Sequence, residues 1–113
     1  MKYVAIQPIS KDEFDRRSKQ FEQDSRFLID SLLGLAEGEE DWKLVQDTLL
    51  EYVTDERDDV VAIALKCLGH TARIHGQLDV NLVRPIVLSF TKSGQKNVRA
   101  SAIDTLDDME MCR

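Results

Sequence analysis

Apolar residues recur through most of the chain at intervals of three and four, the spacing that places side chains on one face of an α-helix. Between residues 41 and 110 this pattern occurs twice, and a shift of 38 positions superimposes the first copy on the second. A fixed period in the thirties indicates a helical repeat array, in which each unit buries its apolar face against its neighbours. The shift carries Leu44, Val45, Leu49, Leu50, Tyr52, Val60, Ala62, Ala64, Leu65 and Leu68 onto Leu82, Val83, Val87, Leu88, Phe90, Val98, Ala100, Ala102, Ile103 and Leu106.

These stripes predict an all-α protein of five to six helices that pair in antiparallel fashion into a short α-solenoid. We expect a single domain over residues 1–113, with an extended arm over 1–9 and matching repeats over 41–75 and 79–110. The pattern over 10–36 fits either one long helix or two helices with a break near Asp24.

Local signals mark several helix ends. Ser10-Lys11-Asp12-Glu13 has the form of a capping box, in which the Ser10 hydroxyl accepts from the Glu13 N–H and the Glu13 carboxylate reaches back. Gly76 is expected to end one helix in the left-handed conformation, and Pro85 to lie in or near the first turn of the next. Acidic residues near the C-terminus are expected to face out and cover the end of the array: Asp104, Asp107, Asp108 and Glu110.

Two segments resemble the HEAT-like repeats. Val83-Arg84-Pro85-Ile86-Val87-Leu88 is similar to the first helix of that repeat, and Val98-Arg99-Ala100-Ser101-Ala102 and residues 60–69 are similar to the second. Val61 replaces the arginine of the pattern in the earlier copy, and Asp107 replaces its glycine in the later copy. The resemblance implies that the helix over 42–53 lines the concave side of the array. It implies a shape and no particular activity.

The formal net charge of -6 disfavours nucleic-acid binding, which needs a basic surface for phosphate contacts. Charge of this sign favours a basic protein partner. No apolar stretch is long enough to cross a membrane, and the N-terminus lacks the pattern of a signal peptide. Two cysteines, Cys67 and Cys112, form no disulfide framework, so we expect reduced thiols in a cytoplasmic protein.

Negative charge is concentrated between residues 37 and 59, where ten acidic residues stand against Lys43 and Arg57. Helix capping accounts for only part of this excess, so the segment is a candidate surface for a basic partner. Trp42 and Tyr52 flank it, and both are expected to pack in the core rather than to anchor a partner. The residues expected to form this surface are Asp47, Glu51, Asp55, Glu56, Asp58 and Asp59.

No catalytic, metal-binding or cofactor-binding motif is present in the sequence: it has no nucleophile elbow, phosphate loop or HExxH. His70 and His75 are five residues apart and therefore lie on different faces of a helix, where we interpret both as helix-end residues. Cys67 and His70 are three apart and can approach each other, but no further ligand is near. We predict a non-enzymatic protein without cofactor or metal.

In size, charge and repeat type the chain is similar to small bacterial immunity proteins of contact-dependent inhibition and other polymorphic-toxin systems. That resemblance implies a cognate toxin domain as the partner, often a basic nuclease, whose active site the immunity protein covers. A tRNA-cleaving RNase is the narrower expectation. Two alternatives remain open: a HEAT-like scaffold or regulatory module that binds a protein in its groove, and a small lyase or chaperone of the phycobilin-lyase type.

Overall fold

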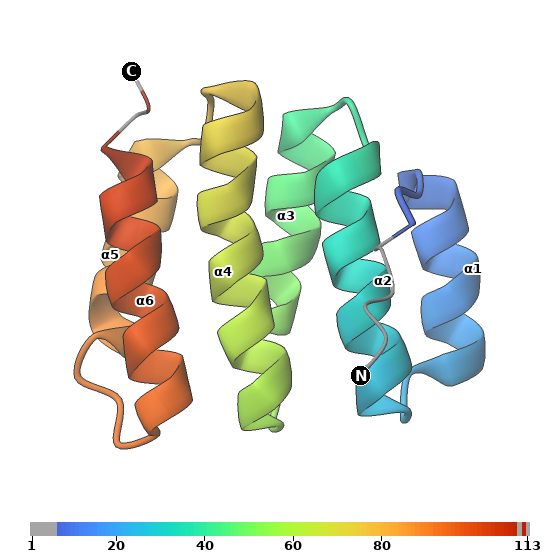
Figure 1. Ribbon diagram of the computed structural model, residues 1–113, viewed down its shortest axis with the longest axis horizontal. Helices are drawn as coiled ribbons and strands as arrows, with labels where there is room; N and C mark the ends of the chain where they lie inside the picture. Colours follow the sequence, from blue (N-terminus) through green and yellow to red (C-terminus); the bar gives the residue numbers. More distant parts are fainter. Residues whose placement is uncertain (1–6, 111, 113) are drawn as a thin grey trace, which may run out of the picture.

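The computed structural model describes residues 7–110 and Cys112, and in this range it contains six α-helices. Consecutive helices run antiparallel and form three pairs that lie side by side in a short stack (Figure 1). The predicted all-α solenoid is therefore confirmed, and the stretch 10–36 consists of two helices; residues 1–6 of the expected arm lie outside the described residues. The helices are α1 (Lys11–Phe21), α2 (Ser25–Gly38), α3 (Trp42–Tyr52), α4 (Asp58–His75), α5 (Val80–Phe90) and α6 (Lys96–Met109).

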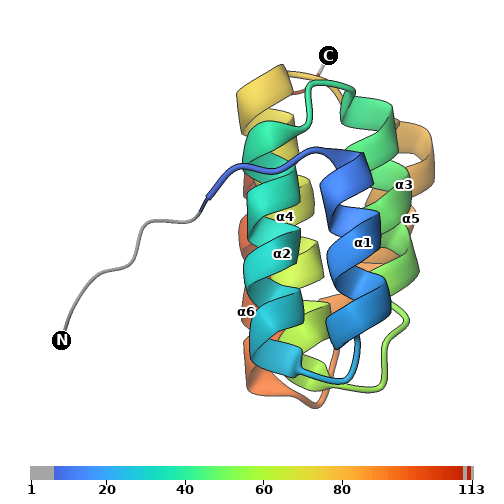
Figure 2. The same cartoon turned by 90° about the vertical axis from the view of Figure 1, so that its right-hand side faces the viewer.

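The first pair is closed by a strap, residues 7–9, that crosses α2 before α1 begins (Figure 2). The Ile9 N–H donates to the Gly34 carbonyl at 3.0 Å. The strap lies so close to α2 that a Cβ at Gly34 would stand 2.6 Å from the Gln7 carbonyl oxygen, and one at Gly38 would collide with the Ile9 backbone. The two glycines of α2 are therefore required by the close approach of the strap.

Ser10 caps α1 as predicted, since its hydroxyl accepts from the Glu13 N–H at 3.2 Å. The prediction that the Glu13 carboxylate reaches back to the cap residue is wrong. The Glu13 carboxylate accepts from Arg16 and from Arg17 Nε (3.1 Å) instead, because charge-assisted donors one turn ahead compete successfully for it. The first N–H of α1, that of Lys11, is satisfied by the Glu39 carboxylate at 2.8 Å, and this bond is the main reason why the pKa of Glu39 is lowered.

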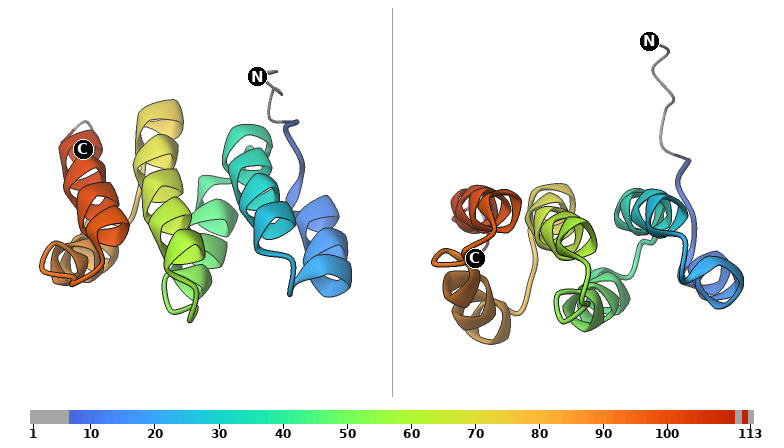
Figure 3. Two further views of the ribbon diagram at one scale, coloured as in Figure 1. Left: turned by 60° about the horizontal axis from the view of Figure 1, so that its bottom comes forward. Right: turned by 90° about the horizontal axis from the view of Figure 1, so that it is seen from below.

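The six helices form two layers, one of α1, α3 and α5 and the other of α2, α4 and α6 (Figure 3). The helix α4 packs directly against both α2 and α6, whereas α1, α3 and α5 are spread further apart. Small side chains at Gly69, Ser101 and Ala102 allow α4 and α6 to approach closely. The stack therefore curves with α2, α4 and α6 on its inner side. The expectation that the helix over 42–53 lines the concave side is wrong, because α3 belongs to the outer layer.

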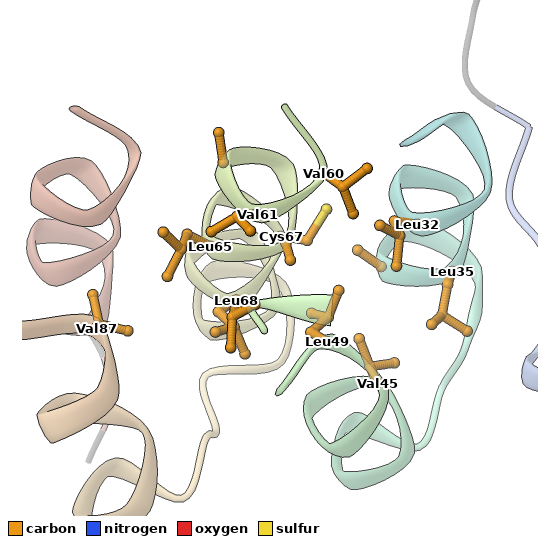
Figure 4. Close-up of a cluster of buried hydrophobic side chains, with 14 of the residues drawn as sticks. Leu32, Leu35, Val45, Leu49, Val60, Val61, Leu65, Cys67, Leu68 and Val87 are labelled. Atoms are coloured by element: carbon orange, nitrogen blue, oxygen red, sulfur yellow. The ribbon is translucent and has the colours of Figure 1, made fainter. Parts of the chain in front are cut away.

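The hydrophobic core is centred on α4, which is buried over much of its circumference (Figure 4). Leu32 and Leu35 reach it from α2, and Val45 and Leu49 reach it from α3. Six polar side chains are buried among the described residues, and two of them form hydrogen bonds between distant segments of the chain. Gln46 accepts from the Asp79 N–H at 2.6 Å, and Thr105 donates to the Leu65 carbonyl at 2.7 Å, which joins α6 to α4.

The C-terminal pair departs from the sequence expectation at two residues. Asp79 caps α5, so Pro85 lies inside the helix rather than in its first turn. Asp108 is half-buried rather than outward-facing, since it packs against Gly69 and lies 3.5 Å from Arg73 Nε. Gly76 has the predicted left-handed conformation, with φ at 65°.

Among the described residues no helix is long and apolar enough to cross a membrane.

Candidate binding surfaces

The six acidic residues expected to form one surface are divided by the fold between two sides of the molecule. Asp47 and Glu51 lie one turn apart on α3, in the outer layer, and both are exposed. Glu56 is exposed in the loop between α3 and α4, and Asp58 is exposed in the first turn of α4. Asp59 follows in the same turn but lines a hollow on the inner side. These residues are close together along the chain, but the α3–α4 hairpin places Asp59 on the opposite side of the stack from Asp47 and Glu51.

On the outer side, a hollow of about 590 Å³ lies between the end of α1 and the α3–α4 loop. Glu51, Asp55 and Glu56 line it, and Glu22 from α1 adds a fourth carboxylate. Sequence reasoning did not find Glu22, because it lies far from the acidic run along the chain and only the contact of the α3–α4 loop with the end of α1 brings it there. Four carboxylates therefore stand against one guanidinium, that of Arg57, in the lining of this outer hollow.

Asp55 has a structural task within this hollow. Its two carboxylate oxygens accept from Arg57 Nε at 2.9 Å and from an Arg57 terminal nitrogen at 3.0 Å. The other terminal nitrogen of Arg57 donates to the Glu22 carbonyl at 2.8 Å, so the pair clamps the α3–α4 loop to the end of α1. The Arg57 guanidinium is the main reason that the pKa of Asp55 is lowered, and the Asp55 carboxylate raises the pKa of Arg57. Asp55 is therefore less free to meet a partner than its exposed neighbours.

The two aromatic residues that flank the acidic run differ from each other. Tyr52 packs against the core, with its ring centroid 5.8 Å from that of Phe14 in an edge-to-face arrangement. Burial is the main reason that the pKa of Tyr52 is raised, and the carboxylate of Glu22 adds to it. The expected core role is confirmed for Tyr52. Trp42 is half-buried at the start of α3 and does not belong to the packed core.

The inner side of the stack carries two hollows along α4, of about 630 Å³ and 490 Å³, with Lys66 lining both. We call them together the inner trough. Its walls come from α2, α4 and α6 and carry charges of both signs. The charged residues that line it are Arg26, Asp30, Glu37, Asp59, Lys66, Arg73, Asp104, Asp107 and Asp108.

A chain of polar contacts crosses the upper part of the trough. His70 Nε2 lies 2.6 Å from the Glu37 carboxylate, and His70 Nδ1 lies 3.0 Å from a terminal nitrogen of Arg73. Because the arginine guanidinium can only donate, His70 Nδ1 accepts this hydrogen bond, and His70 Nε2 carries a proton and donates it in a hydrogen bond to the Glu37 carboxylate. His70 therefore links α4 to α2, and its expected role as a helix-end residue is wrong.

Cys67 lines the same hollow but is only 1% exposed, and burial raises the pKa of its thiol to about 12. A thiol in this state does not supply the thiolate that covalent chemistry requires. A lyase of the phycobilin type, which needs a reactive cysteine or histidine in a deep pocket, therefore finds no support at Cys67. Among residues 7–110 and Cys112, no group of three or more His, Cys, Asp or Glu side chains is arranged to hold a metal ion.

Comparison with known proteins gives a likeness to a solved structure. No family model matches the chain, and no curated protein matches it. Among solved structures, the chain is similar to one in the crystal structure of a CDI complex from Cupriavidus taiwanensis LMG 19424. The two chains are 29% identical and superpose with a TM-score of 0.80, over 100% of this chain and 96% of the other. The likeness therefore covers the whole helix stack.

Proposed function

We propose that this chain is the immunity protein of a contact-dependent inhibition system, which acts in the cytoplasm by binding a cognate toxin domain and covering its active site. The observation that carries the proposal is the full-length likeness, at 29% identity, to a chain of a CDI complex. A complex of contact-dependent inhibition contains a toxin domain and the immunity protein that binds it. This chain has the features expected of the immunity protein.

Three properties favour the immunity side over the toxin side. The net charge is -6, which suits an inhibitor of a basic enzyme and opposes contact with nucleic acid. The Cys67 thiol is buried and kept protonated, and the described residues hold no cluster suited to a metal. A stack of helix pairs also offers extended surfaces, which such folds use for binding. None of these features serves catalysis.

The partner that this surface fits best is a basic toxin domain, and we favour a nuclease, in particular a tRNA-cleaving RNase. A nuclease binds phosphates through a basic groove, and exposed carboxylates can occupy that groove in place of the substrate. The outer hollow and the adjoining face of α3 supply them through Glu22, Asp47, Glu51 and Glu56. Asp58 extends this surface and Asp55 holds the loop in place, whereas Asp59 lines the inner trough.

The test measures binding of the purified chain to the toxin domain encoded beside it, by calorimetry at low and at high salt. We expect a one-to-one complex that weakens with salt, because exposed charges are screened. The triple variant D47N/E51Q/E56Q should bind at least about tenfold more weakly, since it removes three charges from the outer surface. Protection of cells that express the toxin should fall in parallel.

A matched variant, D12N/D30N/D104N, removes the same number of exposed charges elsewhere, two of them from the inner trough. It should bind like the wild type. If this variant loses affinity while the outer variant keeps it, the toxin docks in the inner trough and the outer acidic surface is wrong. If the wild type binds no neighbouring toxin and protects no cell, the proposed function itself fails.

A further inference from the structure

An exposed face of α6, which borders the inner trough at Asp107, carries an ordered row of side chains at spacings of three, four, four and three residues. Such spacings place all of its members on one face of the helix. Ile103 stands at the centre and is 49% exposed, although it is a large apolar residue. We call this row the α6 stripe; its members are Lys96, Arg99, Ile103, Asp107 and Glu110, all at least partly exposed.

Four of the positions of α4 that lie one repeat, or 38 residues, before the α6 stripe form a face that packs against another helix. A shift of 38 residues carries four members of the stripe back to Val61, Leu65, Gly69 and Ala72 of α4, which are all buried, and carries Lys96 back to Asp58, which is exposed. That face of α4 lies against α6, as the bond from Thr105 to the Leu65 carbonyl and the contact of Asp108 with Gly69 demonstrate. In α6 no described helix covers the equivalent face, and its centre has nevertheless remained apolar.

Charge on the stripe is arranged symmetrically about Ile103. Both basic residues, Lys96 and Arg99, precede it, and both acidic residues, Asp107 and Glu110, follow it at matching distances along the chain. A two-fold axis through Ile103 that places a second α6 antiparallel brings Lys96 toward the second Glu110 and Arg99 toward the second Asp107. This is the self-complementarity that an isologous contact requires. The stripe is neutral in sum, so the chain's net charge of -6 is not concentrated at this contact.

The stability of α6 does not explain this order. Basic residues near the start of a helix and acidic residues near its end oppose the helix dipole, so the arrangement costs stability in the isolated chain. Internal partners are few as well. Arg99 donates to the Ser93 carbonyl at 2.9 Å, and Glu110 lies 3.9 Å from Arg84 with its side chain 70% exposed. Within the described part of the chain, Lys96, Arg99 and Asp107 form no ion pair.

We propose that the α6 stripe is a homodimer interface, in which α6 of one copy packs antiparallel against α6 of a second copy. Ile103 contacts Ile103 of the second copy at the centre. On each side of this contact, Lys96 pairs with Glu110 and Arg99 pairs with Asp107 across the interface. The contact is small, so the dimer is in exchange with the monomer and depends on concentration. Its ion pairs lie at the rim of the contact, so it weakens as salt rises.

The experiment measures mass in solution by sedimentation equilibrium over a range of concentrations at low and high salt. The wild type should approach twice 12.9 kDa at high concentration and low salt. The variant K96E/R99E makes the stripe wholly acidic, and D107K/E110K makes it wholly basic. Each should be monomeric alone, and an equimolar mixture of the two should form a heterodimer. The quadruple variant K96E/R99E/D107K/E110K restores the symmetry and should dimerise again.

Circular dichroism melts of every variant serve as the control that each one is folded. The quadruple variant places acids at the start of α6 and bases at its end, so it should melt no lower than the wild type. The proposal is overturned if the wild type stays monomeric up to about 1 mM, a concentration that would still reveal a very weak dimer. It is also overturned if the mixture of the two folded variants stays monomeric, or if K96E/R99E loses only toxin binding, which would make the toxin the occupant of this face.

Discussion

The two ends of the helix stack are closed by different means. At the N-terminal end, the backbone of the strap over residues 7–9 lies directly on Gly34 and Gly38 of α2, and Ile9 of the strap is only 7% exposed. At the C-terminal end, α6 presents charged side chains around a half-exposed Ile103. The backbone contact at the first end leaves no room for a Cβ on either glycine of α2. The charged face at the second end is exposed to solvent.

The largest expected difference concerns the same repeat position in α4 and in α6. Leu65 is 0% exposed and is covered by α6, whereas Ile103, 38 residues later, is 49% exposed. Leu65→Ala should lower the free energy of unfolding by about 3 kcal/mol, because it leaves a cavity beneath α6. Ile103→Ala should change it by less than about 0.5 kcal/mol. Urea unfolding of the monomer at low protein concentration measures both, and equal losses would mean that Ile103 is covered within the chain.

A second difference separates the glycines of the two ends. In Gly38→Ala the new methyl group would strike the backbone of Ile9, so the strap must lift and the unfolding free energy should fall by about 1–3 kcal/mol. Gly94→Ala, in the α5–α6 loop, meets nothing within 4 Å and should change stability by less than about 0.5 kcal/mol. Thermal melts provide the comparison. Hydrogen exchange at the Ile9 amide should rise in the first variant, and an unchanged rate would show that the strap still lies on α2.

The smallest difference concerns the ion pairs of the two ends. The Asp55–Arg57 clamp is partly buried and bidentate, whereas Arg84 and Glu110 approach only to 3.9 Å in the open. Asp55→Asn should lower the unfolding free energy by about 1 kcal/mol at pH 7. Glu110→Gln should have no measurable effect on the unfolding of the monomer. Denaturant titration of the two variants gives the comparison.

The clamp also predicts a dependence on pH. Because the folded pKa of Asp55 lies below its unfolded value, the carboxylate stabilises the fold above pH about 4, and this contribution is lost as the pH falls through the lowered folded pKa. Glu39 contributes with the same sign through its bond to the Lys11 N–H. Stability of the wild type should therefore fall more steeply below pH 4 than that of Asp55→Asn. Parallel curves for the two proteins would remove Asp55 from this account.

Much of the architecture follows from the sequence alone, because helical periodicity is a local property. The spacing of apolar residues predicted five to six helices, the repeat of 38 residues related the last four of them, and Ser10 and Gly76 marked two helix ends. The break near Asp24 was left open, since the apolar stripe continues through it; in the structure Asp24 caps α2. Pro85 was expected in or near the first turn of α5, and it lies further inside the helix because Asp79 caps α5.

Only the tertiary structure decided how these helices curve and which side each acidic residue faces. Curvature depends on how closely small residues such as Gly69 and Ala102 let α4 and α6 approach, and that distance is set between helices far apart in the chain. For the same reason Glu22 joined the outer hollow, Asp59 turned to the inner trough, and Asp55 became part of a clamp. The sequence determined where the negative charge lies along the chain, and the packing of the helices determined which of those charges a partner can reach.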